Sequence, residues 1–166
     1  MQVNEATEGL GYPVFRQERR IRESVMNTSG VAALDHTVQE TNIWLGAVAD
    51  QLHFEDRHHA YIALRAVLHA LRDRLPPEVA VHLGAQLPML VRGVYYEGWH
   101  MTGKPVKDRS IQEFADHVRK ELPPRFPMDP LTVARGVFEV IWERLDPGEF
   151  AKLMDHLPAS VRSLRT

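Results

Sequence analysis

The feature that most constrains this chain of 166 residues is an internal repeat. A shift of 70 residues aligns residues 41–96 with residues 111–166 without a gap, and 12 of these 56 positions are identical. The identical pairs are Val48/Val118, Leu52/Leu122, Arg65/Arg135, Val67/Val137, Arg74/Arg144, Leu75/Leu145, Pro77/Pro147, Leu83/Leu153, Leu87/Leu157, Pro88/Pro158, Val91/Val161 and Arg92/Arg162. A unit of about 55 residues is marginally stable alone, so we expect the two copies to share one core.

Within each copy, apolar residues recur at helical spacing, and prolines divide them into four segments. Thr37 and Ser110 each stand three residues before a glutamate, which is the spacing of a capping box at the start of a helix. Asp56 and Asp129 have the position of N-caps for the long second helices. No alternating run of β-branched residues indicates a strand. The sequence therefore predicts an all-α fold in which a duplicated four-helix unit forms a pseudo-two-fold bundle of about eight helices.

The same pattern predicts the domain organisation. We expect a duplicated helical domain at residues 37–166, with the first repeat at 37–96, a connector at 97–109 and the second repeat at 110–166. Residues 1–36 lie outside the repeat and combine glycines, a proline and a charged segment. We expect this arm to be flexible, or to become ordered only on a partner.

Composition excludes several classes of function. The formal net charge is -2, so no overall positive field attracts the chain to nucleic acid, and we expect no nucleic-acid partner. No apolar run approaches the roughly 20 residues that cross a bilayer, and the start of the chain has no secretory pattern. We therefore expect no membrane association. The absence of cysteine removes disulfides, thiol nucleophiles and thiolate metal ligands.

The nine histidines invite a metal hypothesis, but no two have the three- or four-residue spacing of paired helical ligands. We interpret the polar face of the long helix as solvated or pH-responsive; this face includes His58, Arg65, His69 and Arg72. No nucleophile with an adjacent base and no intact phosphate-binding loop is recognisable. The sequence therefore predicts no metal and no cofactor, and it leaves catalysis undecided.

Two features are candidates for a binding surface. Arg65 and Arg92 recur in both copies, where they either bind helix-terminal carbonyls and acidic groups or line an anion site. Tyr95, Tyr96 and Trp99 end the first copy and have no aromatic equivalents in the second. These rings either pack beneath the connector or form a surface for a partner or ligand. The candidate site residues are therefore Arg65, Arg92, Tyr95, Tyr96 and Trp99.

Three stretches of the first copy look familiar: residues 35–45 (DHTVQETNIWL), 56–75 (beginning DRHHAY) and 80–99 (ending YYEGW). Together they resemble the bacterial family called domain of unknown function 2267, over about residues 35–164. The resemblance implies an all-helical domain in a cytoplasmic bacterial protein. It brings no established activity, cofactor or catalytic residue.

These observations favour a non-enzymatic helical module for protein interaction or regulation, and a use in stress physiology is one form of this hypothesis. Its partner would be another protein or a second copy of the chain. The alternative is a protein that binds a small ligand or an anion, and an enzyme falls within this alternative. Its pocket would lie between the two repeats, lined by Arg65, Arg92, Tyr95 and Tyr96.

Overall fold

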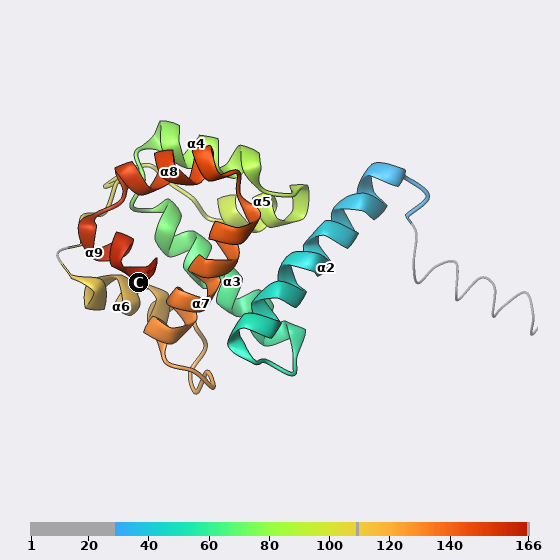
Figure 1. The fold of residues 1–166 in the computed structure, drawn as a ribbon, viewed down its shortest axis with the longest axis horizontal. Helices are drawn as coiled ribbons and strands as arrows, with labels where there is room; N and C mark the ends of the chain where they lie inside the picture. The colour runs from blue at the N-terminus through green and yellow to red at the C-terminus, as the bar shows by residue number, and fades with distance from the viewer. Residues whose placement is uncertain (1–28, 109, 166) are drawn as a thin grey trace, which may run out of the picture. The chain divides into compact units, whose positions relative to one another are not determined.

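The computed structural model describes residues 29–108 and 110–165. These residues form eight α-helices and one short 3-10 helix, and they contain no strand (Figure 1). The elements are α2 (Ala32–Leu52), α3 (Arg57–Arg72), α4 (Pro77–Gln86), α5 (Met89–Tyr96), α6 (Ile111–Glu121), α7 (Pro130–Arg144), α8 (Pro147–His156), α9 (Ala159–Arg162) and η1 (Ser163–Arg165). The predicted all-α class is confirmed.

The described residues divide after His36 into two units. Most of the predicted arm, residues 1–28, lies outside the described residues. In the described part of the first unit, the Ser29 hydroxyl accepts a hydrogen bond from the Val31 N–H at 3.1 Å, just before α2 begins. The account below concerns the second unit.

Helix α2 does not begin at the predicted capping box. It begins at Ala32, so Thr37 is inside the helix and the prediction is wrong. Ala32, Ala33 and Leu34 are strong helix formers, and they extend the helix by more than a turn. The buried Thr37 hydroxyl instead accepts a hydrogen bond from the Leu90 N–H at 3.2 Å, and this bond joins α2 to the first turn of α5.

The other predicted N-caps are confirmed. Ser110 Oγ accepts a hydrogen bond from the third N–H of α6 at 3.2 Å. Asp56 accepts one from the N–H of His58, the second residue of α3, at 2.8 Å, and Asp129 accepts the N–H groups of Leu131 and Thr132, the second and third residues of α7, at 3.1 and 3.0 Å. These bonds satisfy backbone donors that have no partner within the helix, so local sequence determines where α3, α6 and α7 begin.

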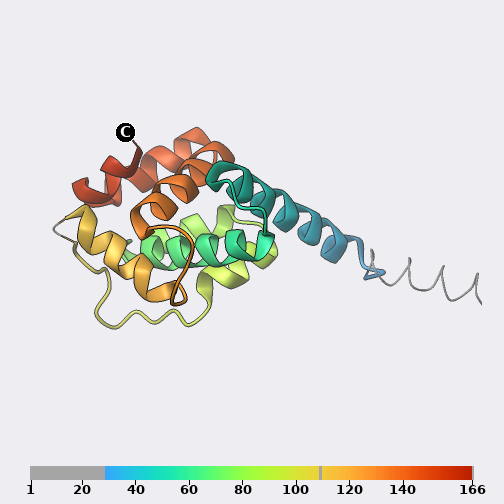
Figure 2. The same cartoon turned by 90° about the horizontal axis from the view of Figure 1, so that it is seen from below.

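Helices α3, α6 and α7 pack against one another and form the centre of the second unit (Figures 1 and 2). Helix α3 also contacts α5, while α4 contacts both α5 and α8. Many core side chains are fully buried, among them Val48, Val67, Leu68, Leu71, Phe114, Val118, Val137, Phe138, Ile141 and Phe150. Leu52 of α2 packs directly on Gly136 of α7, where a Cβ atom would collide with it.

The bounds of one pair of helices, and the burial of the repeated apolar residues, follow the 70-residue shift. Helix α4 spans 77–86 and α8 spans 147–156, and the repeated apolar pairs, such as Val48 and Val118, are buried in both copies. Equivalent helices also contact each other, α3 with α7 and α4 with α8. An approximate two-fold axis requires contacts of this kind, because it brings a surface against its own copy. The two-fold arrangement itself stays a prediction.

Side-chain and backbone contacts join the connector to the segment at the C-terminal end of α3. Arg74 forms a buried, bidentate ion pair with Asp108. Arg74 Nε contacts Asp108 Oδ2, and Arg74 Nη2 lies 3.1 Å from Asp108 Oδ1. Lys104 Nζ lies 2.9 Å from the Asp73 carboxylate, and the Val106 N–H donates to the Asp73 carbonyl at 2.7 Å. These contacts hold the connector along the C-terminal end of α3.

Candidate functional site

Arg92 binds the C-terminal end of α4. Its Nε donates to the carbonyl of Gly84 at 2.8 Å, and its Nη2 donates to the carbonyl of Leu87 at 2.9 Å. The last carbonyls of a helix have no partner within it, and a planar guanidinium can bind two of them at once. The geometry therefore matches the structural interpretation of Arg92, in which the arginine binds helix-terminal carbonyls.

The three aromatic residues of the candidate surface have different environments. Tyr95 is fully buried, and its hydroxyl donates to the Ala80 carbonyl at 2.7 Å, while burial raises the pKa of its phenol. The Tyr96 ring contacts Trp99, with 5.6 Å between centroids, and lies so close to Gly84 that a Cβ there would clash. Both Tyr96 and Trp99 are half-buried. Tyr95 thus fills the core, whereas parts of the other two rings face solvent.

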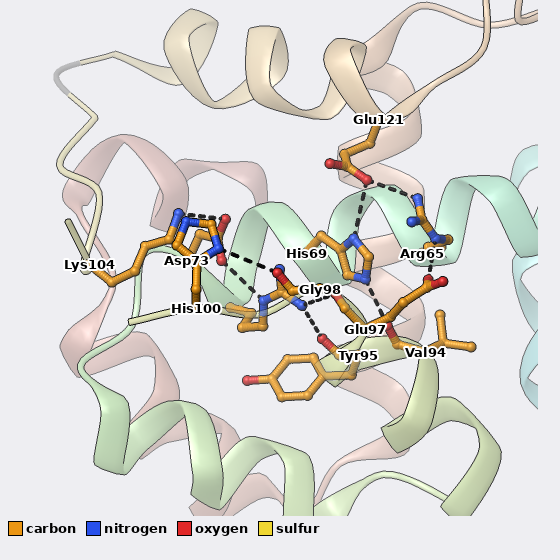
Figure 3. A network of polar contacts seen from close by, with 11 residues as sticks. Arg65, His69, Asp73, Val94, Tyr95, Glu97, Gly98, His100, Lys104 and Glu121 are labelled. Atoms are coloured by element: carbon orange, nitrogen blue, oxygen red, sulfur yellow. Dashed lines mark hydrogen bonds and ion pairs between the residues drawn. The ribbon is translucent and has the colours of Figure 1, made fainter. Parts of the chain in front are cut away.

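Arg65 belongs to a network of polar contacts (Figure 3). Its Nε lies 2.8 Å from Glu97, and its Nη1 lies 2.9 Å from Glu121 Oε2. The hydrogen bond from Arg65 lowers the pKa of Glu97, and the same bond raises the pKa of Arg65. Binding of an external anion by Arg65 would therefore compete with two carboxylates, and a role of the five candidate residues as a binding surface stays a prediction.

The interpretation of this helix face as solvated is wrong for His69 and Arg72, which are buried. Arg72 Nη1 donates to the carbonyls of Tyr95 and Glu97, the latter at 3.0 Å. His69 Nε2 lies 2.7 Å from the Val94 carbonyl, and Nδ1 lies 3.2 Å from Glu121. Helical spacing alone places both residues on a polar face, but α5 and the chain that follows it cover that part of the face.

Acid is expected to weaken the network at Asp73. Burial alone would raise the pKa of Asp73, but hydrogen bonds from Lys104 and Arg72 outweigh it and lower the pKa. A carboxyl whose pKa is lower in the folded state stabilises the fold above its unfolded pKa, about 3.9, and loses this contribution as the pH falls through the folded pKa. Urea unfolding of wild type and Asp73→Asn between pH 6 and pH 3 should show a difference that shrinks on acidification. A difference in the free energy of unfolding that stays constant over this pH range would contradict a lowered pKa of Asp73 in the folded state.

Sequence reasoning missed a cleft between α4 and α8. It has a volume of about 300 Å³. Its lining consists of Glu78, Val79, His82, Leu83, Gln86, Leu145, Glu149, Lys152, Leu153 and His156. The buried Leu83, Leu145 and Leu153 form an apolar floor, while the polar side chains stand at the rim. None of the five predicted site residues lines this cleft.

Residues of α4 and α8 that correspond at the 70-residue shift line the cleft together. At the 70-residue shift, Leu83 corresponds to Leu153 and His82 corresponds to Lys152, and all four line the cleft. The identical leucines form the floor, whereas the rim positions have diverged. The signal that would have found the cleft is the pairing of identical leucines with differing neighbours in two segments that the 70-residue shift aligns.

The cleft combines an apolar floor with charged side chains. Lys152 Nζ lies 2.8 Å from Glu149 on the same helix, and the hydrogen bond between them raises the pKa of Lys152. Within the described residues, no group of three or more histidine, aspartate or glutamate side chains is arranged to hold a metal ion. An apolar floor with a rim of both charges suits the burial of an apolar group beside a few oriented polar contacts.

A family model described as "Uncharacterized conserved protein (DUF2267)" matches residues 41–164, which is most of the chain. The chain belongs to this family, and the resemblance seen in the sequence is confirmed. No curated protein matches the sequence. In the part of the chain that the structure describes, no helix has the length and apolar character needed to cross a bilayer.

Proposed function

We propose that this chain is a non-enzymatic helical module for protein interaction, and that the cleft between α4 and α8 receives an apolar side chain from a segment of the partner. The observation that supports the proposal is the cleft itself. Its floor of buried leucines offers an apolar surface, and its exposed polar rim would orient the peptide backbone and neighbouring side chains. The proposal includes the bacterial cytoplasm as its location, as the family resemblance implies.

The charges at the rim favour a partner segment with a basic residue. Lys152 and Glu149 neutralise each other. Glu78 is exposed and has no hydrogen-bond or ion-pair partner among the described residues, so it is the rim charge left to attract a ligand. A lysine or arginine one helical turn from an apolar anchor would place its cation near Glu78 while the anchor enters the cleft.

The alternative is a small apolar ligand bound between the two copies. The observation in its favour is that the cleft is formed by one helix from each copy and that its volume lies at the lower end of small-molecule pockets, roughly 300–1,000 Å³. The version of this alternative with Arg65, Arg92, Tyr95 and Tyr96 has less support. Arg65 and Arg92 already bind oxygen atoms of the protein, and Tyr95 is in the core.

Blocking the cleft at its rim should weaken binding without disturbing the fold. His82 is an exposed lining residue, and His82→Trp would place a bulky ring across the opening. The probe is a labelled helical peptide of about 16 residues with leucines at four-residue spacing and arginines beside them. We expect fluorescence anisotropy to show binding to the wild type and a loss of about tenfold or more in His82→Trp.

The matched control is Val81→Trp, because Val81 is the preceding residue, is exposed and does not line the cleft. It should keep the wild-type affinity within about twofold. A peptide with glutamates in place of the arginines should bind more weakly. Equal affinity of the two tryptophan variants, or no binding to the wild type, would contradict the proposal. Binding of the apolar dye anilinonaphthalene sulfonate at the cleft without peptide binding would support the small-ligand alternative instead.

A further inference from the structure

The side chain of His69 is only 5% exposed, and both of its ring nitrogens face hydrogen-bond acceptors (Figure 3). Nε2 lies 2.7 Å from the carbonyl oxygen of Val94, and Nδ1 lies 3.2 Å from Oε2 of Glu121. A neutral imidazole has one N–H and can donate to only one of these oxygens. The doubly protonated ring can donate to both, so this geometry matches the cationic form.

The surroundings contain both signs of charge. On its own helix, His69 is accompanied by Arg65 and the buried Arg72, and Asp73 is the C-cap of that helix. Glu97 follows α5, and Glu121 is the last residue of α6. Lys104 of the connector belongs to the same network through Asp73.

The two arginines are largely engaged by oxygen atoms. Arg65 binds Glu97 and Glu121, while Arg72 binds Asp73 and two carbonyls at the C-terminal end of α5. The carbonyl of Val94 lies in the last turn of α5, where the helix dipole is negative and favours a cation. A positive ring at His69 therefore has a carboxylate on one side and a helix end on the other.

These contacts join three helices from both copies of the repeat. His69 lies in α3 and Val94 in α5, within the first copy, whereas Glu121 lies in α6, within the second. At the 70-residue shift, His69 corresponds to Glu139, so the second copy has no equivalent histidine. The contact between His69 and Glu121 therefore has no counterpart at the shifted position.

We propose that His69 is a proton-dependent link between the two copies, through which pH controls how firmly the C-terminal turn of α6 is held. The protonated ring joins α3 to Val94 and Glu121 together. When the ring loses one proton, it keeps a single N–H, and an Nδ1 lone pair then faces the Glu121 carboxylate. The turn that ends at Glu121 consequently opens more often, while the buried core helices stay closed.

The test combines ring ¹⁵N NMR with amide hydrogen exchange on the full chain between pH 5.5 and pH 8.5. The ring signals of His69 should show two N–H groups at the acidic end. As one proton leaves, amide exchange in the last turn of α6 should rise about tenfold beyond the intrinsic effect of pH. The exchange of the α7 core should not change in this way.

Three variants decide the outcome. His69→Gln should remove the pH dependence at the end of α6, and the control His82→Gln, at an exposed histidine, should retain it. Glu121→Gln should also remove the pH dependence but keep the turn protected, because an amide N–H can donate to the Nδ1 of a neutral ring. A ring with one N–H throughout, or the same pH dependence in His69→Gln as in wild type, would overturn the proposal.

Discussion

Replacing Asp108 with asparagine should lower the free energy of unfolding by about 3–5 kcal/mol, the usual cost of breaking a buried ion pair. The side chains of Arg74 and Asp108 are 1% and 2% exposed, so the variant leaves the Arg74 cation buried without its counterion. Arg74 also donates to the Ala70 carbonyl at 2.6 Å and lies 5.0 Å from the Phe114 ring centre. The pair therefore joins the connector to α3 and α6, and chemical denaturation followed by circular dichroism measures its loss.

The repeat provides a matched control for the arginine. Arg144 occupies the position equivalent to Arg74, but it is exposed. Arg74→Met should destabilise the domain by an amount similar to Asp108→Asn, whereas Arg144→Met should change stability by no more than about 0.5 kcal/mol. Equal effects at the two positions would show that Arg74 and Asp108 do not form the buried pair described here.

Replacing Phe150 with alanine should cost about 3–5 kcal/mol, because it removes a fully buried ring and leaves a cavity. The Phe150 centroid lies 4.6 Å from that of Trp142 and 5.6 Å from that of Phe138, both with edge-to-face geometry. These contacts hold α8 against α7, so the loss should also loosen one wall of the cleft. Urea unfolding gives the stability, and the helical peptide defined above gives the affinity.

The control for Phe150 is Ala151→Ser, at the next residue of α8, which is exposed. Its effect on stability should stay within about 0.5 kcal/mol, and peptide binding should be unchanged. A Phe150→Ala variant with full stability would mean that α8 is not anchored by this ring. If Phe150→Ala lowered the free energy of unfolding by about 3–5 kcal/mol but left peptide affinity unchanged, the ring would stabilise the fold without shaping the cleft.

The sequence predicted a helix start correctly where the capping side chain and the capped N–H groups belong to the same short segment. Asp56 and Ser110 cap helices with their own side chains, so short sequence patterns identify them. Thr37 has the same pattern, but its hydroxyl bonds to Leu90, more than fifty residues away, and strong helix formers precede it. A local pattern cannot report a partner that only the fold provides.

The aromatic cluster shows why the candidate surface could not be resolved from sequence. In the first copy, Tyr95 reaches over the small Ala80 and bonds to its carbonyl. In the second copy, Phe150 occupies the position equivalent to Ala80, and Arg165 replaces Tyr95. The large Tyr95 is thus paired with the small Ala80, whereas the large Phe150 has no tyrosine beside it at the shifted position. A large core residue at one position compensates for a small one at the other. Alignment shows the asymmetry, but only packing shows that Tyr95 fills the core.

The cleft was missed for a related reason. The positions that are identical at the 70-residue shift include Leu83 and Leu153 of the floor, and these leucines resemble ordinary core residues. The rim residues His82 and Lys152 differ between the copies and look like ordinary surface. They become a site only because α4 and α8 lie side by side (Figure 1). The contact between α4 and α8 is a tertiary contact, and the periodicity of apolar residues within one segment does not predict it.

Methyl NMR at the floor of the cleft tests the central proposal most directly. With the leucine methyl groups labelled in the full chain, the arginine-containing helical peptide is titrated and the signals of Leu83 and Leu153 are followed. We predict that both residues shift and saturate at the same peptide concentration, with magnetisation transfer to the leucines of the peptide. Peptide binding that leaves both residues unshifted and perturbs another surface would contradict the assignment of the cleft as the binding site.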